Sequence, residues 1–185
     1  MSIDLATAET IPTGAWTADA LHSSVGFSVK HMVVSTFRGG FSSFDARLVS
    51  DDAGRVALAG AVRSASIDTR DPNLTGHILS EEFLSADENP EITFEATEVR
   101  RDGDRVEFVG QLTIKGITHP LSATGTIAEP VDDPFGGVRL GLGLEATIDR
   151  RAYEMNWNTA LPGGGLALGN DLTLSVQLEF TKDAE

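Results

Sequence analysis

The sequence predicts an all-β protein, a single antiparallel eight-stranded barrel with a short helical insertion around residues 71–86. Apolar and polar residues alternate over long runs, which is the period of strands buried on one face. Turn-forming residues separate these runs, and only one segment has a helical pattern. Strands of about ten residues favour a sheet that closes on itself, because a sandwich of this size generally uses shorter strands.

The expected strands follow one another along most of the chain. The longest strict alternation runs from Val138 to Ile148, and the last one runs from Leu172 to Phe180. Because strand side chains alternate between two faces, the even-numbered residues of both runs should enter one shared core. Further strands are expected near residue 16 and over residues 25–29, 37–48, 56–62, 92–99, 106–114 and 121–127.

The helical insertion begins with clear start signals. Asp71 can cap a helix and Pro72 suits its first position. Gly76 weakens a continuous helix. We therefore expect two short helical turns, the second started by Ser80 with acidic residues in its first turn.

Length and composition narrow the class of protein. A chain of 185 residues suits one domain, and we expect a barrel over residues 14–182 preceded by a disordered or loosely held segment, residues 1–13. The net charge of −14 argues against nucleic acid and anionic membrane surfaces as partners. No stretch approaches the roughly 20 apolar residues of a membrane-spanning helix, so stable membrane insertion is not expected. The first residues lack the basic start and apolar core of a signal peptide, which predicts a cytoplasmic location.

The sequence contains few residue patterns that would indicate catalysis or metal binding. Cysteine is absent, so thiol nucleophiles and thiolate metal sites are excluded. Gly141-Leu-Gly143 lacks the third glycine of a dinucleotide fingerprint, and the glycine run 163–165 lacks the lysine of a phosphate loop. The histidines do not form a pair with metal-ligand spacing, and we expect no metal, cofactor or catalytic residue. They are His22, His31, His77 and His119.

The expected interior mixes large apolar side chains with small ones. An eight-stranded barrel is just wide enough to be filled by its own side chains or to hold one small ligand. The small residues either leave a cavity or accommodate crossing side chains in a tapering barrel, and the pattern favours neither alternative. These residues are Gly60, Gly110, Ala123, Gly125 and Ala146.

Several motifs together resemble the YceI-like family. They are His22-Ser-x-Val-x-Phe-x-Val-x-His31, Phe37-x-Gly-Gly-Phe41, His77-Ile-Leu-Ser-x-Glu-Phe83, Pro90-x-Ile-x-Phe94 and Gly110-x-Leu-Thr-Ile-Lys-Gly-Ile-Thr-x-Pro120. The resemblance extends from about Trp16 to Phe180. It implies a lipocalin-like barrel with a long apolar interior that binds a polyisoprenoid or a quinone-like lipid without catalysis. Ala152 and Glu154 depart from the family pattern, in which an Asp and a Gly are common.

The first functional hypothesis is therefore a protein that binds a long apolar ligand inside the barrel. The residues expected at the mouth are Arg38, His77 and Trp157. The residues expected to line the interior, each of which could also be ordinary core, are Phe27, Val29, Phe94, Phe108, Leu112, Leu142 and Leu144.

Two alternatives stay open. One is a small-barrel enzyme, an isomerase or hydrolase that uses His77 or His31 as acid or base, which requires a histidine and a carboxylate that converge in a cavity. The other is a stress-associated dimer with a filled barrel and no ligand. The sequence does not fix the oligomeric state, so a homodimer also stays open for the lipid-binding protein.

Overall fold

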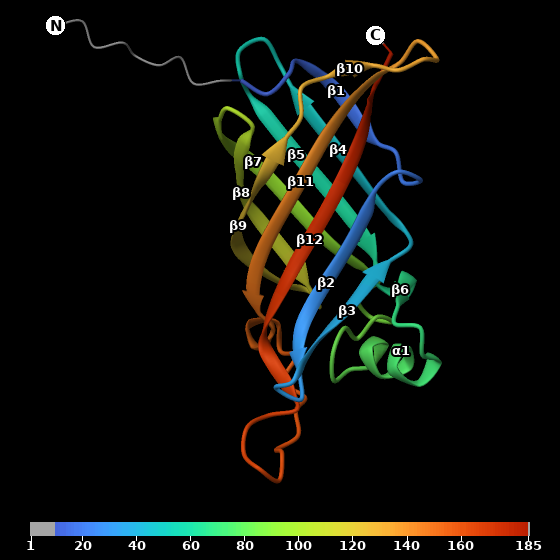
Figure 1. Cartoon of the computed structure of the whole chain (residues 1–185), viewed down its shortest axis with the longest axis vertical. Helices are drawn as coiled ribbons and strands as arrows, with labels where there is room; N and C mark the ends of the chain where they lie inside the picture. Colours follow the sequence, from blue (N-terminus) through green and yellow to red (C-terminus); the bar gives the residue numbers. More distant parts are fainter. Residues whose placement is uncertain (1–9, 185) are drawn as a thin grey trace, which may run out of the picture.

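The computed structural model describes residues 10–184 and forms an antiparallel barrel of long, tilted strands with one helix at its lower end (Figure 1). We call this lower end the helix end. The strands that form the closed ring are β1 (Gly14–Ala18), β4 (Phe44–Ser50), β5 (Val56–Arg63), β7 (Glu91–Asp102), β8 (Arg105–Ile114), β9 (Ile117–Ile127), β11 (Val138–Asp149) and β12 (Leu168–Lys182). The remaining strands are β2 (Ser24–His31), β3 (Ser35–Phe41), β6 (Ile67–Asp68) and β10 (Val131–Asp132).

Strand β12 closes the barrel because it pairs with β11 on one side and with β1 and β2 on the other. Within residues 10–184, the closed ring has the order β12-β11-β9-β8-β7-β5-β4-β1, which confirms the predicted eight-stranded barrel. Toward the helix end, β2 takes the place of β1 beside β12, and β3 pairs with β2 as β4 pairs with β1. The short β6 pairs with β3. The long β12 therefore spans both levels of the molecule.

The predicted alternation on the last two long strands is also confirmed. Leu140 and Leu142 of β11 are 1% and 2% exposed, and they pair in register with Phe180 and Leu178 of β12, which are 0% and 7% exposed. The odd-numbered neighbours point outward, as Thr147 does. The sheet therefore has one apolar face, and closure of the barrel turns that face inward.

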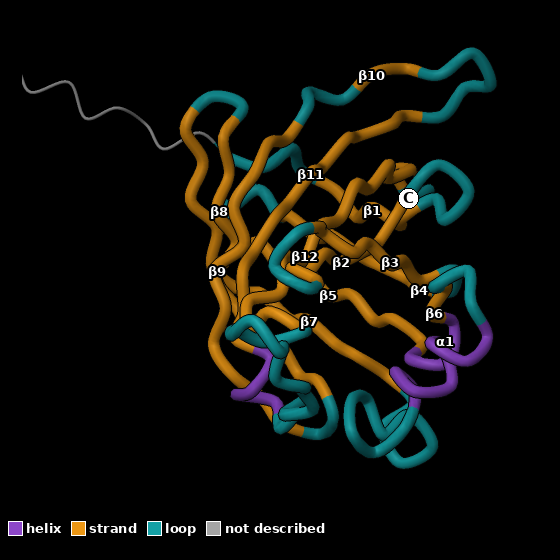
Figure 2. Tube along the Cα trace, turned by 60° about the horizontal axis from the view of Figure 1, so that its bottom comes forward, coloured by secondary structure: helices purple, strands orange, loops and turns teal. Residues whose placement is uncertain are grey.

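The helix α1 (Pro72–Leu79) begins as predicted and lies beside β6 at the helix end (Figures 1 and 2). The carboxylate of Asp71 accepts a hydrogen bond from the backbone N–H of Leu74 at 2.8 Å. Ser80 ends α1, because its hydroxyl donates to the carbonyl of His77 at 2.7 Å and its own backbone is extended. A single hydrogen-bonded turn starts at Ser80, whose carbonyl accepts from the backbone N–H of Phe83 at 3.1 Å.

A second irregular segment follows β11. It starts with a 3₁₀ turn, Arg150–Tyr153, which lies at the helix end across from α1 (Figure 2). Glu154 ends this turn in the left-handed region, with φ of 56°. That conformation favours glycine, so Glu154 stands where a glycine would be free of strain.

The N-terminal segment that we expected to be loosely held, residues 1–13, lies partly outside the residues that the structure describes, which start at residue 10. In the described part of this segment, Ile11 is 1% exposed and belongs to the core. Its carbonyl accepts a hydrogen bond from the hydroxyl of Ser50 at 3.1 Å. Ordered packing therefore begins before residue 14.

Two apolar clusters fill the barrel at different heights. The cluster away from the helix is centred on Trp16, Leu48, Phe108 and Phe180. The cluster at the helix end joins the strands to the two irregular segments, and it contains Phe83, Leu84, Ile114, Ile148, Tyr153 and Met155. Within residues 10–184, no helix has the length and apolar character needed to cross a membrane.

Candidate ligand cavity

A cavity of about 440 Å³ lies inside the barrel and extends toward the helix end. Its volume falls in the range of small-molecule pockets, roughly 300–1,000 Å³. The deep part is walled by strand residues such as Leu144 and Leu178, and the outer part by residues of α1 and of the segment after β11. The wall is mostly aliphatic and aromatic carbon, because the strands turn their apolar faces inward.

Most of the predicted lining residues lie on this cavity. Phe27 and Val29 of β2, Phe94 of β7, Leu112 of β8 and Leu144 of β11 all contribute to its wall.

Phe108 and Leu142, which were also predicted to line the interior, are not among the residues that surround the cavity. They point inward, but they are 1% and 2% exposed within the cluster that fills the other end of the barrel. Alternation along a strand fixes the face on which a side chain lies but leaves its height along the barrel undetermined.

The small inward residues fall into two groups. Gly60, Ala123 and Ala146 line the cavity and leave room in it. Gly110 and Gly125 do not line it, because a neighbouring backbone takes their space: a Cβ would lie 2.1 Å from the carbonyl oxygen of Glu95 at Gly110, and 1.9 Å from that of Gly143 at Gly125. These two glycines allow close strand packing and leave no cavity space.

Two of the three predicted mouth residues meet at the helix end. The rings of His77 and Trp157 contact edge to face, with centroids 4.9 Å apart, and both line the cavity. Phe83 completes this aromatic cluster at 5.0 Å from His77 and 5.8 Å from Trp157. The Nε2 atom of His77 lies 2.7 Å from a carboxylate oxygen of Glu82, whose side chain is 57% exposed.

Arg38 is the third predicted mouth residue, and it lies elsewhere. Its side chain is on the outer, exposed surface of β3 and does not line the cavity. The reason is its position on the strand: Phe37 turns into the cavity, so the next residue turns out.

Arg150 lines the cavity and was not predicted. It is 1% exposed, and its Nε donates to the carbonyl of Gly169 at 2.8 Å while Nη1 donates to the carbonyl of Met155. The signal was present in the sequence, because Arg150 continues the even-numbered inward series of β11 by one step. It was missed because it stands in the charged run Asp149-Arg150-Arg151, and such a run is typical of a solvent-exposed strand end.

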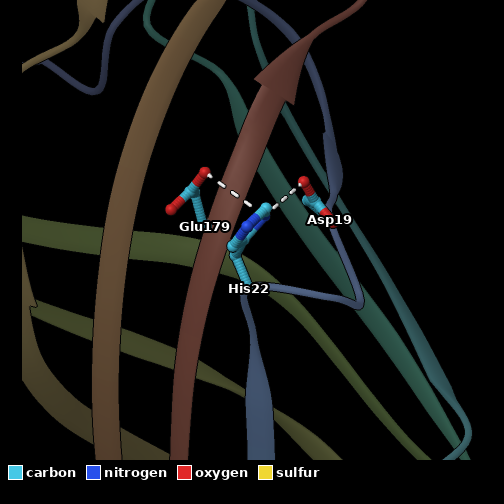
Figure 3. Close-up of side chains that lie close together, drawn as sticks. All are labelled: Asp19, His22 and Glu179. Carbon is cyan, nitrogen blue, oxygen red and sulfur yellow. Dashed lines mark hydrogen bonds and ion pairs between the residues drawn. The ribbon is translucent and has the colours of Figure 1, made fainter.

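A histidine and two carboxylates meet on the outside of the barrel, with ligand atoms of His22, Asp19 and Glu179 within 4.8 Å of one another (Figure 3). His22 Nδ1 lies 2.9 Å from Asp19 Oδ2, which lowers the pKa of Asp19 and raises that of His22. The guanidinium of Arg139 occupies the same oxygens, 2.8 Å from Asp19 and 3.0 Å from Glu179. This group is therefore part of an ion-pair network centred on Arg139, and it supplies no argument for a metal.

The geometry defines a small β-barrel with an apolar internal cavity that opens beside an aromatic rim. Residues 16–180 match the family model of the YceI-like domain, and the chain belongs to this family. A UPF0312 protein of Staphylococcus aureus is 34% identical over 172 residues, which cover 90% of this chain and 96% of the relative. A UPF0312 protein of Staphylococcus epidermidis is 32% identical over 168 residues, covering 89% and 96%.

Solved structures share the fold. The structure of BcnA from Burkholderia cenocepacia is similar with a TM-score of 0.75 and 20% identity, over 88% of this chain and 98% of that one. A YceI protein of Campylobacter jejuni gives a TM-score of 0.69 with 22% identity, over 90% and 96%. A polyisoprenoid-binding domain from Saccharophagus degradans gives a TM-score of 0.61 with 12% identity, over 92% and 100%.

Proposed function

We propose that this barrel binds a long apolar amphiphile, a polyisoprenoid or an isoprenoid quinone, in its cavity and carries or stores it without catalysing a reaction. The observation that supports this most is the wall of the cavity. Phenylalanines of β2, β3 and β7 and leucines of β8, β11 and β12 surround a void of about 440 Å³. Such a wall favours hydrocarbon, because transfer of apolar surface from water is favourable and needs no directed partner.

The size of the cavity sets the length of chain that it can hold. If each ligand carbon takes about the ~30 Å³ share of a water molecule, a void of about 440 Å³ holds roughly fifteen of them. A C15 prenyl chain therefore matches the cavity, and a longer chain would extend past the aromatic rim or widen the barrel.

The family membership also supports a lipid ligand. The structural neighbour from Saccharophagus degradans is described as a polyisoprenoid-binding domain, and it shares the whole barrel with this chain. At 12% identity that likeness concerns the fold, so the ligand class of this chain rests on its own cavity.

A chain-length series tests the proposal. Geraniol, farnesol and geranylgeraniol carry 10, 15 and 20 carbons and the same hydroxyl head, and each can be titrated while the fluorescence of Trp157 at the rim is followed. Burial of a CH₂ group contributes about 0.8 kcal/mol, so affinity should rise steeply from the first prenol to the second. It should level off at the third, because the cavity is then full. Absence of binding by all three would refute the proposal.

The contact between His77 and Glu82 favours one alternative, an enzyme that uses this histidine as acid or base. The pair lies at the rim, where the Glu82 side chain is 57% exposed and water competes for it. We expect farnesol to be recovered chemically unchanged after long incubation with the protein. Conversion of farnesol that disappears in His77→Phe would favour the enzyme.

A further inference from the structure

Arg150 is a buried cation in the wall of an otherwise apolar cavity. It is 1% exposed and lines the cavity at the helix end of β11. Its two hydrogen bonds go to backbone carbonyls, those of Gly169 and Met155, which are neutral. These bonds hold the guanidinium in place, and the nearby carboxylate of Asp149 favours its charged form without forming an ion pair with it.

The neighbouring acidic group is already paired. The carboxylate of Asp149 lies 2.6 Å from Nη2 of Arg151, and both of its oxygens bond to that side chain. Within residues 10–184, Arg150 forms no ion pair. An arginine stays protonated near neutral pH even though burial lowers the pKa of its guanidinium. A buried charge without a counter-ion is costly, so a partner of opposite charge would be strongly favoured here.

One nitrogen of Arg150 remains available to such a partner. Nε and Nη1 donate to the backbone, whereas Nη2 has no hydrogen-bond partner among the described residues. Among the described residues, every side-chain nitrogen or oxygen that is fully inaccessible has a hydrogen-bond partner. Because Nη2 has none, it must keep some accessible surface. Because Arg150 is buried from the outside and lines the cavity, that surface faces the cavity.

We propose that Arg150 binds the headgroup of the ligand, and that this headgroup is an anion, a carboxylate or a phosphate. The inference rests on the proposed function, because it gives an orientation and a charge to the same ligand. The apolar tail lies toward Leu144 and Leu178 in the deep part of the cavity, and the head lies under the aromatic rim. Arg150 and Leu144 are six residues apart along β11, roughly 20 Å at the rise of a strand, which leaves length for the tail.

A matched set of C15 probes tests this assignment. Farnesol, farnesoic acid and farnesyl phosphate share one tail and differ in the head, and their affinities are measured by calorimetry at pH 7.5. Hydrogen bonds between ions are much stronger than those between neutral groups, so an anionic head should bind at least about tenfold more tightly than the alcohol. The tighter of the two anions identifies the head as carboxylate or phosphate.

Two substitutions link the preference to Arg150. In Arg150→Gln the anions should lose their advantage and bind within about threefold of farnesol on the same variant. The matched control is Arg38→Gln, which removes an exposed charge on the outer face of β3, away from the cavity, and should leave the preference intact. Melting curves verify that both variants fold.

The results separate this inference from the proposed function. Equal affinity of the wild type for farnesol and both anions would overturn the role of Arg150 and leave lipid binding in place, and this comparison needs no variant. A preference for the anions that persists in Arg150→Gln would also overturn the role of Arg150 in headgroup binding. Arg150 would then only connect the backbone segments with which it forms hydrogen bonds. Failure of all three probes to bind would overturn both proposals.

Discussion

Substitution of Ala146 by Phe narrows the cavity from within and tests whether the ligand enters the barrel. Ala146 lies on β11 and lines the cavity, next to Leu174 in register on β12. The new side chain adds six carbons, which occupy on the order of 100–200 Å³ by the volume share of a water molecule. That is about a third of the void of about 440 Å³.

The loss of affinity follows from the carbons that no longer fit. A C15 chain would lose the burial of about five carbons, and at about 0.8 kcal/mol per CH₂ this amounts to at most ~4 kcal/mol. Each ~1.4 kcal/mol is a factor of ten, and the chain can recover part of the loss by extending from the rim. We therefore expect farnesol to bind Ala146→Phe between about 30-fold and 1,000-fold more weakly than it binds the wild type.

The matched control is Thr147→Phe, which adds a phenyl ring to the next residue of the same strand on the exposed outer face. It should bind farnesol as the wild type does. Overpacking at residue 146 should cost ~1–3 kcal/mol, so the melting temperature should fall by no more than about 12 °C. A folded Ala146→Phe variant with wild-type affinity for farnesol would mean that the ligand binds outside the barrel.

Three further predictions concern stability, and thermal melting measures each of them. Gly110→Ala should lower the free energy of unfolding by about 3 kcal/mol or more, because its Cβ would lie 2.1 Å from a backbone oxygen. In the control Gly60→Ala the nearest atom lies 3.5 Å from the new Cβ, so this variant should melt near the wild type. Equal melting temperatures of the two variants would refute the packing argument. Asp19 raises the pKa of His22, so this ion pair stabilises the fold below about pH 6.5 and is lost as pH rises through the folded pKa. The melting temperature should therefore fall as the pH rises above about 6.5 in the wild type, and a similar fall in His22→Asn would contradict this. Glu154→Gly should raise the melting temperature by about 2–4 °C, because it removes a backbone strain of ~1 kcal/mol at φ of 56°. A decrease would show that the Glu154 side chain stabilises the fold by more than its backbone strain costs.

The alternation of residues along the strands predicted which face each side chain takes. It also predicted the even-numbered inward series of β11 and β12, and the Asp71-Pro72 pair predicted the start of α1. These features are local, because they depend on the period of a strand or on the first turn of a helix. Most of the predicted lining residues line the cavity for the same reason.

The parts that could not be predicted depend on contacts between distant segments. Phe108 and Leu142 have the inward parity of the lining residues, but the height at which the core cluster forms is set by closure of the whole barrel. Gly110 is small because the backbone of β7 approaches it, which the sequence of β8 alone does not reveal. Arg150 is buried because Met155 and Gly169, which follow it in the chain, supply the carbonyls that hold it.

The most direct test of lipid binding is the content of the barrel itself. The protein, purified without detergent, is extracted with organic solvent, and the extract is analysed by mass spectrometry beside an extract of the Ala146→Phe variant. We predict an isoprenoid lipid in an amount comparable to the protein, and much less of it with the variant. An extract without any such lipid, from a protein that also takes up no farnesol when it is supplied, would contradict the proposal that this barrel binds lipid.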